Sequence, residues 1–190
     1  IISGPEIQAW RTPTDNDRGG PKFINKWSAY GLKKLQLISS DVSSKQIEHG
    51  IYIQAVQHYK TESGYSIENR FTYIIHADGE IELNQFTTFD EQIISLAETG
   101  LPRIGLRMEI SPEYNQFSWY GRGPWENYSD RKSSALIGKY SLPVEDLMVN
   151  YTRPQTNGNR TDIRWAMLHN NRFGIAVYAD NQIESSAHYY

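Results

Sequence analysis

The 190-residue sequence contains no cysteine and only three methionines. Without cysteine the chain has neither disulfide bonds nor thiolate metal ligands, although this absence does not choose between compartments such as the cytoplasm and the periplasm. The sequence also lacks an apolar run of the roughly 20 residues that a membrane-spanning helix needs, and it lacks a charged-then-apolar leader. We therefore expect no membrane contact. Because Ile1 is not an initiator residue, we expect the chain to be part of a longer protein.

An excess of one charge is missing as well. Charged residues make up 22% of the chain and the formal net charge is −3, so no basic field would attract nucleic acid. No glycine-rich phosphate-binding motif occurs, and no nucleotide cofactor is implied. His169 and His188 stand apart from cysteine or serine motifs, which favours structural roles for both.

Aromatic residues, in contrast, are abundant at 13% of the chain, with thirteen tyrosines and five tryptophans. Such side chains suit the surfaces of β-sheets, and they also stack on the apolar faces of sugars and bases. Composition alone leaves both interpretations open.

Hydrophobic residues after Ser39 alternate with a period of two, which is typical of half-buried strands. Residues 46–88 are predicted to form a three-stranded antiparallel meander with turns at 62–64 and 77–79, and further strands are predicted at 104–110, 116–120, 163–168 and 173–178. Phe23, Trp27 and Tyr30 indicate one short amphipathic helix near 21–35, with Pro21 at its start. We therefore predict a mainly β fold, an antiparallel β-sandwich forming a single domain over 1–190.

Three regions fit neither period, at 11–20, 119–131 and 151–164. The second, WYGRGPWENYSDR, combines aromatic rings, glycines, proline and charges, as in ordered loops that carry recognition or chemistry. The Asp15-x-Asp17 pair in the first region invites a calcium site, but the closing glutamate of an EF-hand is missing. We expect these aspartates to cap backbone amides or to pair with arginines.

Catalysis by the fragment alone is not expected. Acid–base catalysis by a pair of carboxyl groups needs one member that acts as a general acid, with a raised pKa. Glu126 with Asp130, and Asp15 with Asp17, are the candidate pairs. An arginine lies close in sequence to each pair, and an arginine partner lowers a carboxyl pKa.

Four motifs taken together resemble a known family. They are Arg11-x-Pro13-x-Asp15-Asn16-Asp17-x-Gly19, Pro102-Arg103-Ile104-Gly105, Tyr120-Gly121-x-Gly123-Pro124-x-Glu126-Asn127-Tyr128-x-Asp130-Arg131 and Pro154-Gln155-x-Asn157-Gly158-x-Arg160. In order and spacing the chain resembles the C-terminal, small-chain domain of the glycoside hydrolase family 2 β-galactosidases. The resemblance runs through nearly the whole sequence.

The resemblance implies a galactose-mutarotase-like supersandwich within a larger multidomain glycosidase, packed beside the mouth of a catalytic (β/α)8 barrel of the same polypeptide. The whole enzyme would be a retaining β-galactosidase acting on terminal β-galactosides, with both catalytic glutamates on the barrel. The fragment would then hold no catalytic residue, metal or cofactor. A divalent cation in the whole enzyme and a homo-oligomer are left open.

The same resemblance implies that the three irregular loops dock on the barrel and shape the outer part of the sugar site. The residues expected in this role are Arg11, Asp15, Asn16, Asp17, Gly19, Tyr120, Arg122, Glu126, Asn127, Tyr128, Asp130, Arg131, Gln155, Asn157 and Arg160. Gly19 and Gly20 give the first loop a hinge for closure. The arginines are expected to bond to acids, Asp130 among them, or to backbone carbonyls.

Two departures from the family pattern stand out. Thr156 occupies the place of a common glutamate in the Gln-Glu-Asn-Gly motif, and the chain ends before a later family segment with a sugar-stacking tryptophan. The sandwich is therefore expected to be incomplete at its C-terminal end. Two alternatives remain: a carbohydrate-binding module with Trp119, Trp125 and Tyr128 as its stacking platform, or a structural domain that serves oligomer assembly.

Overall fold

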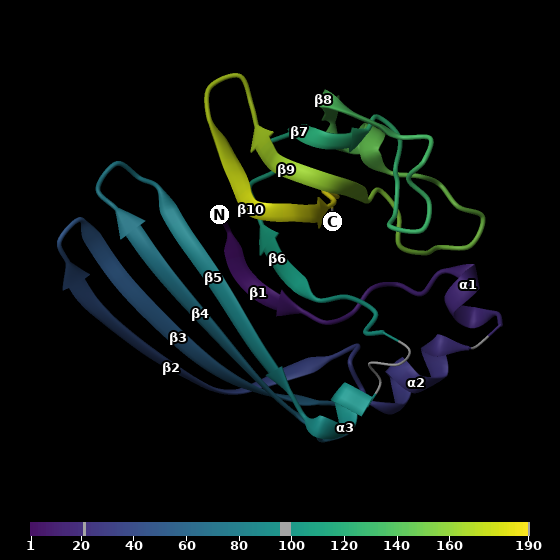
Figure 1. Ribbon diagram of the computed structural model, residues 1–190, viewed down its shortest axis with the longest axis horizontal. Helices are drawn as coiled ribbons and strands as arrows, with labels where there is room; N and C mark the ends of the chain where they lie inside the picture. Colours follow the sequence, from purple (N-terminus) through teal and green to yellow (C-terminus); the bar gives the residue numbers. More distant parts are fainter. Residues whose placement is uncertain (21, 96–99, 190) are drawn as a thin grey trace. The chain divides into compact units, whose positions relative to one another are not determined.

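The computed structural model describes residues 1–20, 22–95 and 100–189. Strands make up 52% of the chain and helices 11%, and the sheets are antiparallel, which confirms the predicted mainly β class and is consistent with a β-sandwich. Contacts divide the chain into two compact units (Figure 1): unit 1 comprises Ile1–Glu6 and Arg107–Tyr190, and unit 2 comprises Ile7–Leu106. The expectation of a single domain stays a prediction.

Strands β1 (Ser3–Gln8) and β6 (Gly105–Glu109) form a two-stranded sheet of their own. The chain passes from one unit to the other within each of them. Gly4, with φ +89°, lies so close to the partner strand that an added Cβ would sit 2.7 Å from the carbonyl oxygen of Arg107. Glycine is therefore required at this position.

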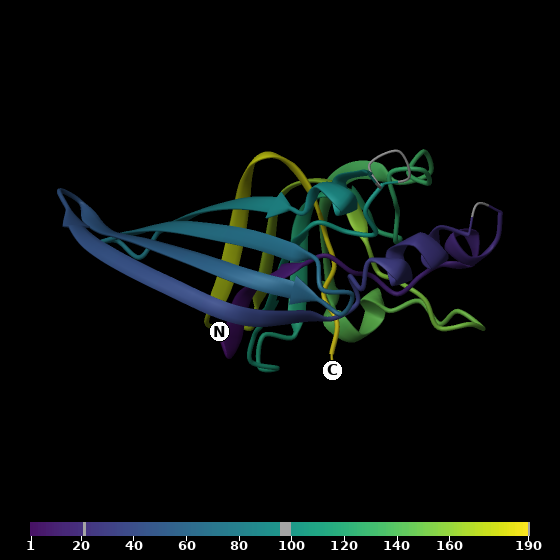
Figure 2. The ribbon, with the colours of Figure 1, turned by 90° about the horizontal axis from the view of Figure 1, so that it is seen from below.

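Unit 2 is built on one twisted, curved sheet with the order β2-β3-β4-β5 (Figure 2). Its strands are β2 (Leu35–Ile47), β3 (Gly50–Thr61), β4 (Ser66–His76) and β5 (Ile81–Phe89). The last three strands confirm the predicted meander. The sheet begins one strand earlier than predicted, with β2. This strand was not predicted because it is rich in serine, is exposed along nearly its whole length and shows little alternation of apolar residues.

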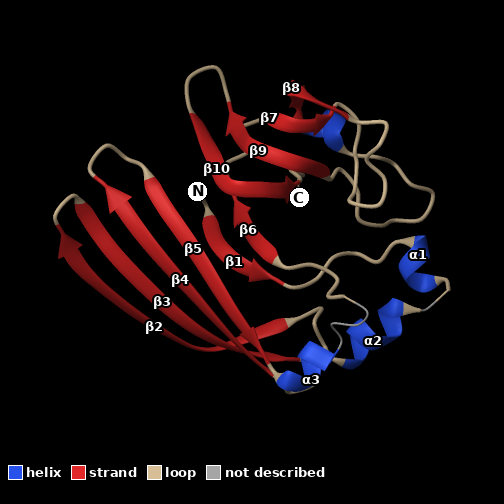
Figure 3. Ribbon diagram, viewed as in Figure 1, coloured by secondary structure: helices blue, strands red, loops and turns tan. Residues whose placement is uncertain are grey.

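Three short helices lie near the end of this sheet that is opposite to the β2–β3 and β4–β5 turns (Figure 3). They are α1 (Asp15–Arg18), α2 (Phe23–Ala29) and α3 (Glu91–Ile94). The predicted helix near 21–35 is thus shorter than expected, because Lys22 adopts a left-handed conformation before it and Tyr30 caps its end. Pro21, its predicted first residue, lies outside the described residues.

The core of unit 2 lies at the helix end of the sheet and comprises the buried side chains Ile7, Ala9, Leu32, Tyr59, Ile67 and Ile93. Beyond it, Asn69 is fully buried on the same face of β4 as Ile67. Its Oδ1 accepts hydrogen bonds from Gln85 Nε2 at 2.7 Å and Thr87 Oγ1 at 2.8 Å, and its Nδ2 donates to Gln57 Oε1 at 3.4 Å. These contacts, which we call the Asn69 ladder, satisfy a buried amide across three strands.

Unit 1 is built on a second sheet, with the order β10-β9-β7-β8. Its strands are β7 (Gln116–Gly123), β8 (Leu136–Pro143), β9 (Arg160–His169) and β10 (Gly174–Ser185), and a single 3-10 turn, η2 (Val144–Leu147), follows β8. Strands β7, β9 and β10 were predicted with shorter bounds, whereas β8 was not predicted. The irregular regions at 119–131 and 151–164 are correspondingly shorter, since residues 119–123 and 160–164 are strand.

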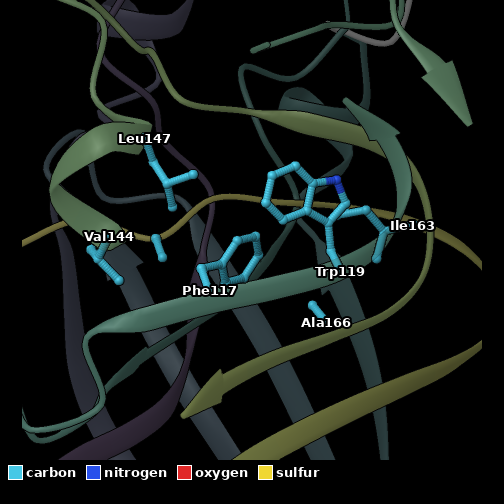
Figure 4. Close-up of a cluster of buried hydrophobic side chains, with 7 residues drawn as sticks. Phe117, Trp119, Val144, Leu147, Ile163 and Ala166 are labelled. Atoms are coloured by element: carbon cyan, nitrogen blue, oxygen red, sulfur yellow. The ribbon is translucent and has the colours of Figure 1, made fainter. Parts of the chain in front are cut away.

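Apolar side chains from β7, β9 and η2 form the core of unit 1 (Figure 4). Phe117 and Trp119 stack with ring centroids 5.4 Å apart, and the indole nitrogen of Trp119 donates to the carbonyl of Arg122 at 2.9 Å. Burial of a side chain of this size contributes roughly 2–3 kcal/mol. Trp119 is 0% exposed, so it cannot belong to the stacking platform that the binding-module alternative predicted.

Candidate functional site

Loop 11–20 of unit 2 is closed by a bidentate ion pair between Arg11 and Asp17. Arg11 Nη1 and Nη2 donate to the two carboxylate oxygens at 2.5 and 2.8 Å, while Arg11 Nε donates to the carbonyl of Pro102 at 2.9 Å. The guanidinium also lies over the ring of Trp27, 5.1 Å from its centroid. The loop is therefore fastened both to α2 and to the segment before β6.

Asp17 also caps the N-terminus of α1. Its Oδ2 accepts bonds from the amide and the hydroxyl of Thr14 at 2.7 and 2.8 Å, which is one half of a capping box. Burial raises the pKa of Asp17, but the bonds from Arg11 and Thr14 outweigh it, so the pKa lies below its ordinary value. Asp17 is thus a capping and ion-pairing residue, as the sequence indicated.

The remaining predicted residues of this loop, Asp15, Asn16 and Gly19, are exposed. Asp15 lies 3.8 Å from Arg18 Nη1. Both side-chain oxygens of Asp17 accept protein hydrogen bonds. In the described part of the chain no group of three or more metal-binding side chains is found.

Glu126 joins the two loops of unit 1. Its carboxylate accepts hydrogen bonds from Tyr151 Oη, Arg131 Nη2 at 2.6 Å, the amide of Gly158 at 2.8 Å and Tyr128 Oη at 3.3 Å. Residues 124–131 and 151–158 are therefore tied to one another by a single buried acid, whose side chain is only 7% exposed.

The bonds to Glu126 keep it ionised. Burial raises its pKa, but hydrogen bonds from Tyr151, Gly158 and Arg131 outweigh this effect and lower the pKa. A carboxyl group with a lowered pKa is a poor general acid, so the geometry suits a structural anion. This agrees with the expectation drawn from the neighbouring arginine.

Asn127 lies beneath this network and is 1% exposed. Its Oδ1 accepts bonds from the amide and the hydroxyl of Thr161 at 2.8 and 2.6 Å, and its Nδ2 donates to the carbonyl of Trp125 at 2.9 Å. Asn159 adds a bond to the carbonyl of Asn127 at 3.0 Å. The loop after β7 is thus pinned to the start of β9.

Arg160 is a buried cation, 3% exposed. It donates to the carbonyls of Gly158 and Pro124 at 2.8 and 3.0 Å, and it lies over the ring of Trp119, 5.2 Å from the centroid. Desolvation lowers its pKa. Its contacts with two loop carbonyls and a core ring couple the loop conformation to the hydrophobic core of unit 1.

Arg122 pairs with Asp162, a residue that the sequence did not single out. Arg122 Nε lies 2.5 Å from Asp162 Oδ2 and Lys132 Nζ lies 2.9 Å from Oδ1. Hydrogen bonds from Lys132 and Arg122 lower the pKa of Asp162. Tyr120 packs beneath a further cation, since the guanidinium carbon of Arg164 lies 5.2 Å from its ring centroid.

Three further predicted residues lie in the loops of unit 1. Asp130 is exposed and makes no ion pair or hydrogen bond among the described residues, so the expectation that it partners an arginine is wrong. The single hydroxyl proton of Tyr128 is shared between Glu126 at 3.3 Å and the carbonyl of Thr156 at 3.2 Å. Asn157 donates to the carbonyl of Gln155 at 3.1 Å and accepts from the amide of Val149 at 3.3 Å.

Signals for the residues that were missed are weak. Tyr151 reaches Glu126 from 25 positions away, and no local pattern connects the two. Asp162 stands between Arg160 and Arg164, a charge alternation that could have marked it as a partner. His169, expected to be structural, lies 2.8 Å from the hydroxyl of Ser118 through its Nε2.

Comparisons with known proteins identify the family of this chain. The family model described as the beta galactosidase small chain matches residues 1–190. The chain is 31% identical over 194 residues to a β-galactosidase of Arthrobacter sp. (strain B7), covering 88% of this chain and 18% of that protein. It is 29% identical over 194 residues to a β-galactosidase of Vibrio cholerae, covering 94% of this chain and 18% of that protein.

A third relative gives the same result. The β-galactosidase of Kluyveromyces lactis is 31% identical over 175 residues, covering 85% of this chain and 15% of that protein. A match of the family model to the whole sequence means that the chain belongs to the β-galactosidase small-chain family. It spans less than one fifth of the length of these relatives.

The candidate residues belong to different units. Loop 11–20 lies in unit 2, and the loops around Glu126 and Gly158 lie in unit 1. Their grouping on one docking face stays a prediction.

None of the described helices is long and apolar enough to cross a membrane.

Proposed function

We propose that this chain is a domain of a retaining β-galactosidase that hydrolyses terminal β-D-galactosides. In this proposal it is not catalytic by itself. It packs on the catalytic (β/α)8 barrel of the same polypeptide, and its loops shape the outer part of the sugar site. The family match and the small share of each relative that the chain covers support this assignment.

The main observation in favour of a role for these loops beside the sugar site is the hydrogen-bond network around Glu126. One buried carboxylate holds residues 124–131 and 151–158 together through four donors. Trp125, next to this carboxylate, is 73% exposed, and Met148, just before the second loop, is 61% exposed. Rigid loops that present large apolar side chains suit a contact surface.

Kinetics of the full-length enzyme would test this proposal. In a Glu126→Gln variant the single amide oxygen can accept from Tyr151 or from Gly158 but not from both, because they bond to different carboxylate oxygens, and the ion pair with Arg131 is lost. We expect kcat/KM for a chromogenic β-galactoside to fall by about tenfold or more, because misplaced positioning loops raise the barrier. NMR of the first-formed product should show the β-anomer if the mechanism is retaining.

Glu113→Gln is the matched control, because Glu113 is exposed and has only a local bond from Ser111 at 3.3 Å. Its kcat/KM should equal that of the wild type. If both variants retain full activity and thermal stability, the loops do not support the sugar site. If the wild-type enzyme shows no turnover of β-galactosides, the proposed activity itself is refuted.

A carbohydrate-binding module is the second candidate, and the exposure of Trp125 favours it. An exposed indole can stack on the apolar face of a sugar. Calorimetric titration of residues 1–190 with galactose and lactose separates the two proposals. Millimolar or tighter binding that is lost in Trp125→Ala supports the module, whereas no binding fits a domain that acts only with its partner.

A further inference from the structure

Two cations in unit 1 share the carboxylate of Asp162, and a third bonds to its backbone carbonyl. Arg122, Lys132 and Arg164 surround Asp162, whose two side-chain oxygens are taken by Arg122 and Lys132. Arg122 is further used by bonds from Nη1 to two backbone carbonyls, those of Lys132 at 3.2 Å and Ala135 at 2.8 Å. Three positive charges against one negative charge leave a surplus of two.

Arg164 carries one of these two surplus charges. Its Nη1 donates to the backbone carbonyl of Asp162 at 2.6 Å, and its guanidinium lies over the ring of Tyr120. Among the described residues no carboxylate lies within ion-pairing distance of Arg164. Its other nitrogens, Nε and Nη2, make no hydrogen bond in that part of the chain.

The environment of Arg164 prepares it to bind an anion. Asp162 adopts a left-handed conformation, with φ +53°, and its carbonyl fixes one end of the guanidinium. Tyr120 supports one face of the group by a cation–π contact. Arg164 and Tyr120 are both partly exposed. A guanidinium held in this way loses little conformational entropy when a planar carboxylate binds along its edge.

We propose that Arg164, which lies over Tyr120 and shares Asp162 as a contact with Lys132, is a docking point for an aspartate or glutamate side chain of the catalytic domain. This inference rests on the proposed function. Charge complementarity and the planar fork of the guanidinium select a carboxylate. The relatives carry more than four fifths of their length outside the matched region, so most of the surface of such a protein lies beyond the residues described here.

Zero-length cross-linking in the full-length protein tests this docking point. A carbodiimide joins a lysine amine to a carboxylate in direct contact, with loss of water, so an Arg164→Lys variant converts the contact into an amide. Peptide mass spectrometry should find position 164 linked to an aspartate or glutamate outside residues 1–190. In 1 M salt the yield should fall by about fivefold or more, because screening weakens exposed ion pairs.

Arg172→Lys provides the matched control, since Arg172 is exposed in unit 1 and has no side-chain partner among the described residues. Position 172 should give no cross-link outside residues 1–190. Native Lys132 supplies a second readout in the wild-type protein, which needs no substitution. Links of position 164 only to acids within residues 1–190, or only to a second copy of the chain, overturn the inference.

Activity distinguishes this inference from the proposed function. If β-galactosides are hydrolysed but neither position 164 nor Lys132 reaches an outside carboxylate, only the docking point is wrong. If the cross-link forms and no β-galactoside is turned over, the docking point stands while the proposed activity fails.

Discussion

Replacement of Asn127 by alanine should destabilise unit 1 strongly. The side chain is 1% exposed and bonds to the amide and hydroxyl of Thr161 and to the carbonyl of Trp125. Thr161 is itself 1% exposed, so water cannot replace the acceptor that its amide loses. An unsatisfied buried donor costs about 1–3 kcal/mol, and the lost hydroxyl bond adds about 1 kcal/mol. We expect a loss of about 2–4 kcal/mol.

Equilibrium urea unfolding measures this loss. Tryptophan fluorescence reports on the transition because Trp119 is fully buried in unit 1. Thr161→Val keeps the shape of the side chain and removes only the hydroxyl, so it should cost about 1 kcal/mol. In the double variant the losses should not add, since both residues share one bond.

Asn181→Ala is the control for the asparagine substitution. Asn181 is exposed on β10, and its replacement should change the unfolding free energy by less than about 0.5 kcal/mol. If Asn127→Ala costs no more than this control, the reasoning from unsatisfied buried groups is refuted.

Three further predictions concern the two units. Folding lowers the pKa of Glu126 from 4.5. The ionised carboxylate therefore stabilises the fold fully above the unfolded pKa, and this stabilisation is lost as the pH falls through the folded pKa. Urea unfolding from pH 7 to 3 should show a weaker pH dependence of the unfolding free energy in Glu126→Gln than in the wild type. Gly121→Ala should cost about 1–3 kcal/mol in urea unfolding, because its Cβ would lie 2.9 Å from the backbone Cα of Ile163, and a neutral result would contradict the close strand approach. Arg11→Lys should lower the unfolding free energy of unit 2 by about 1–3 kcal/mol, since lysine cannot form the bidentate pair with Asp17; an unchanged melting temperature would show that the pair contributes nothing.

The sequence predicted those features of the structure that depend on a local residue pattern. The alternation in residues 65–75 located β4, and the spacing of arginine and aspartate in loop 11–20 indicated a pair that the structure shows between Arg11 and Asp17. Strand β8 escaped notice because Gly138 and Lys139 interrupt its apolar residues. Its pairing with β7 is a tertiary effect.

Within the candidate site, contacts between residues far apart in the sequence could not be predicted. The pair of Glu126 and Arg131 lies within one loop and was expected, whereas Tyr151 and Gly158 join it from a separate segment. The role of Asp162 depends on a left-handed backbone conformation that aspartate only occasionally adopts. The contacts of Tyr151 and Gly158 with Glu126 have no local sequence signal.

The Asn69 ladder has a consequence for how the sheet of unit 2 finds its pairing. A slip of β4 by one residue would turn Asn69 to the opposite face and separate it from Gln57, Gln85 and Thr87 together. A slip by two residues would keep the apolar side chains on the same face, but it would still break these directional amide bonds. The Asn69 ladder therefore helps to set the strand register. It favours one alignment of the three long strands over alignments that would place the apolar face toward water.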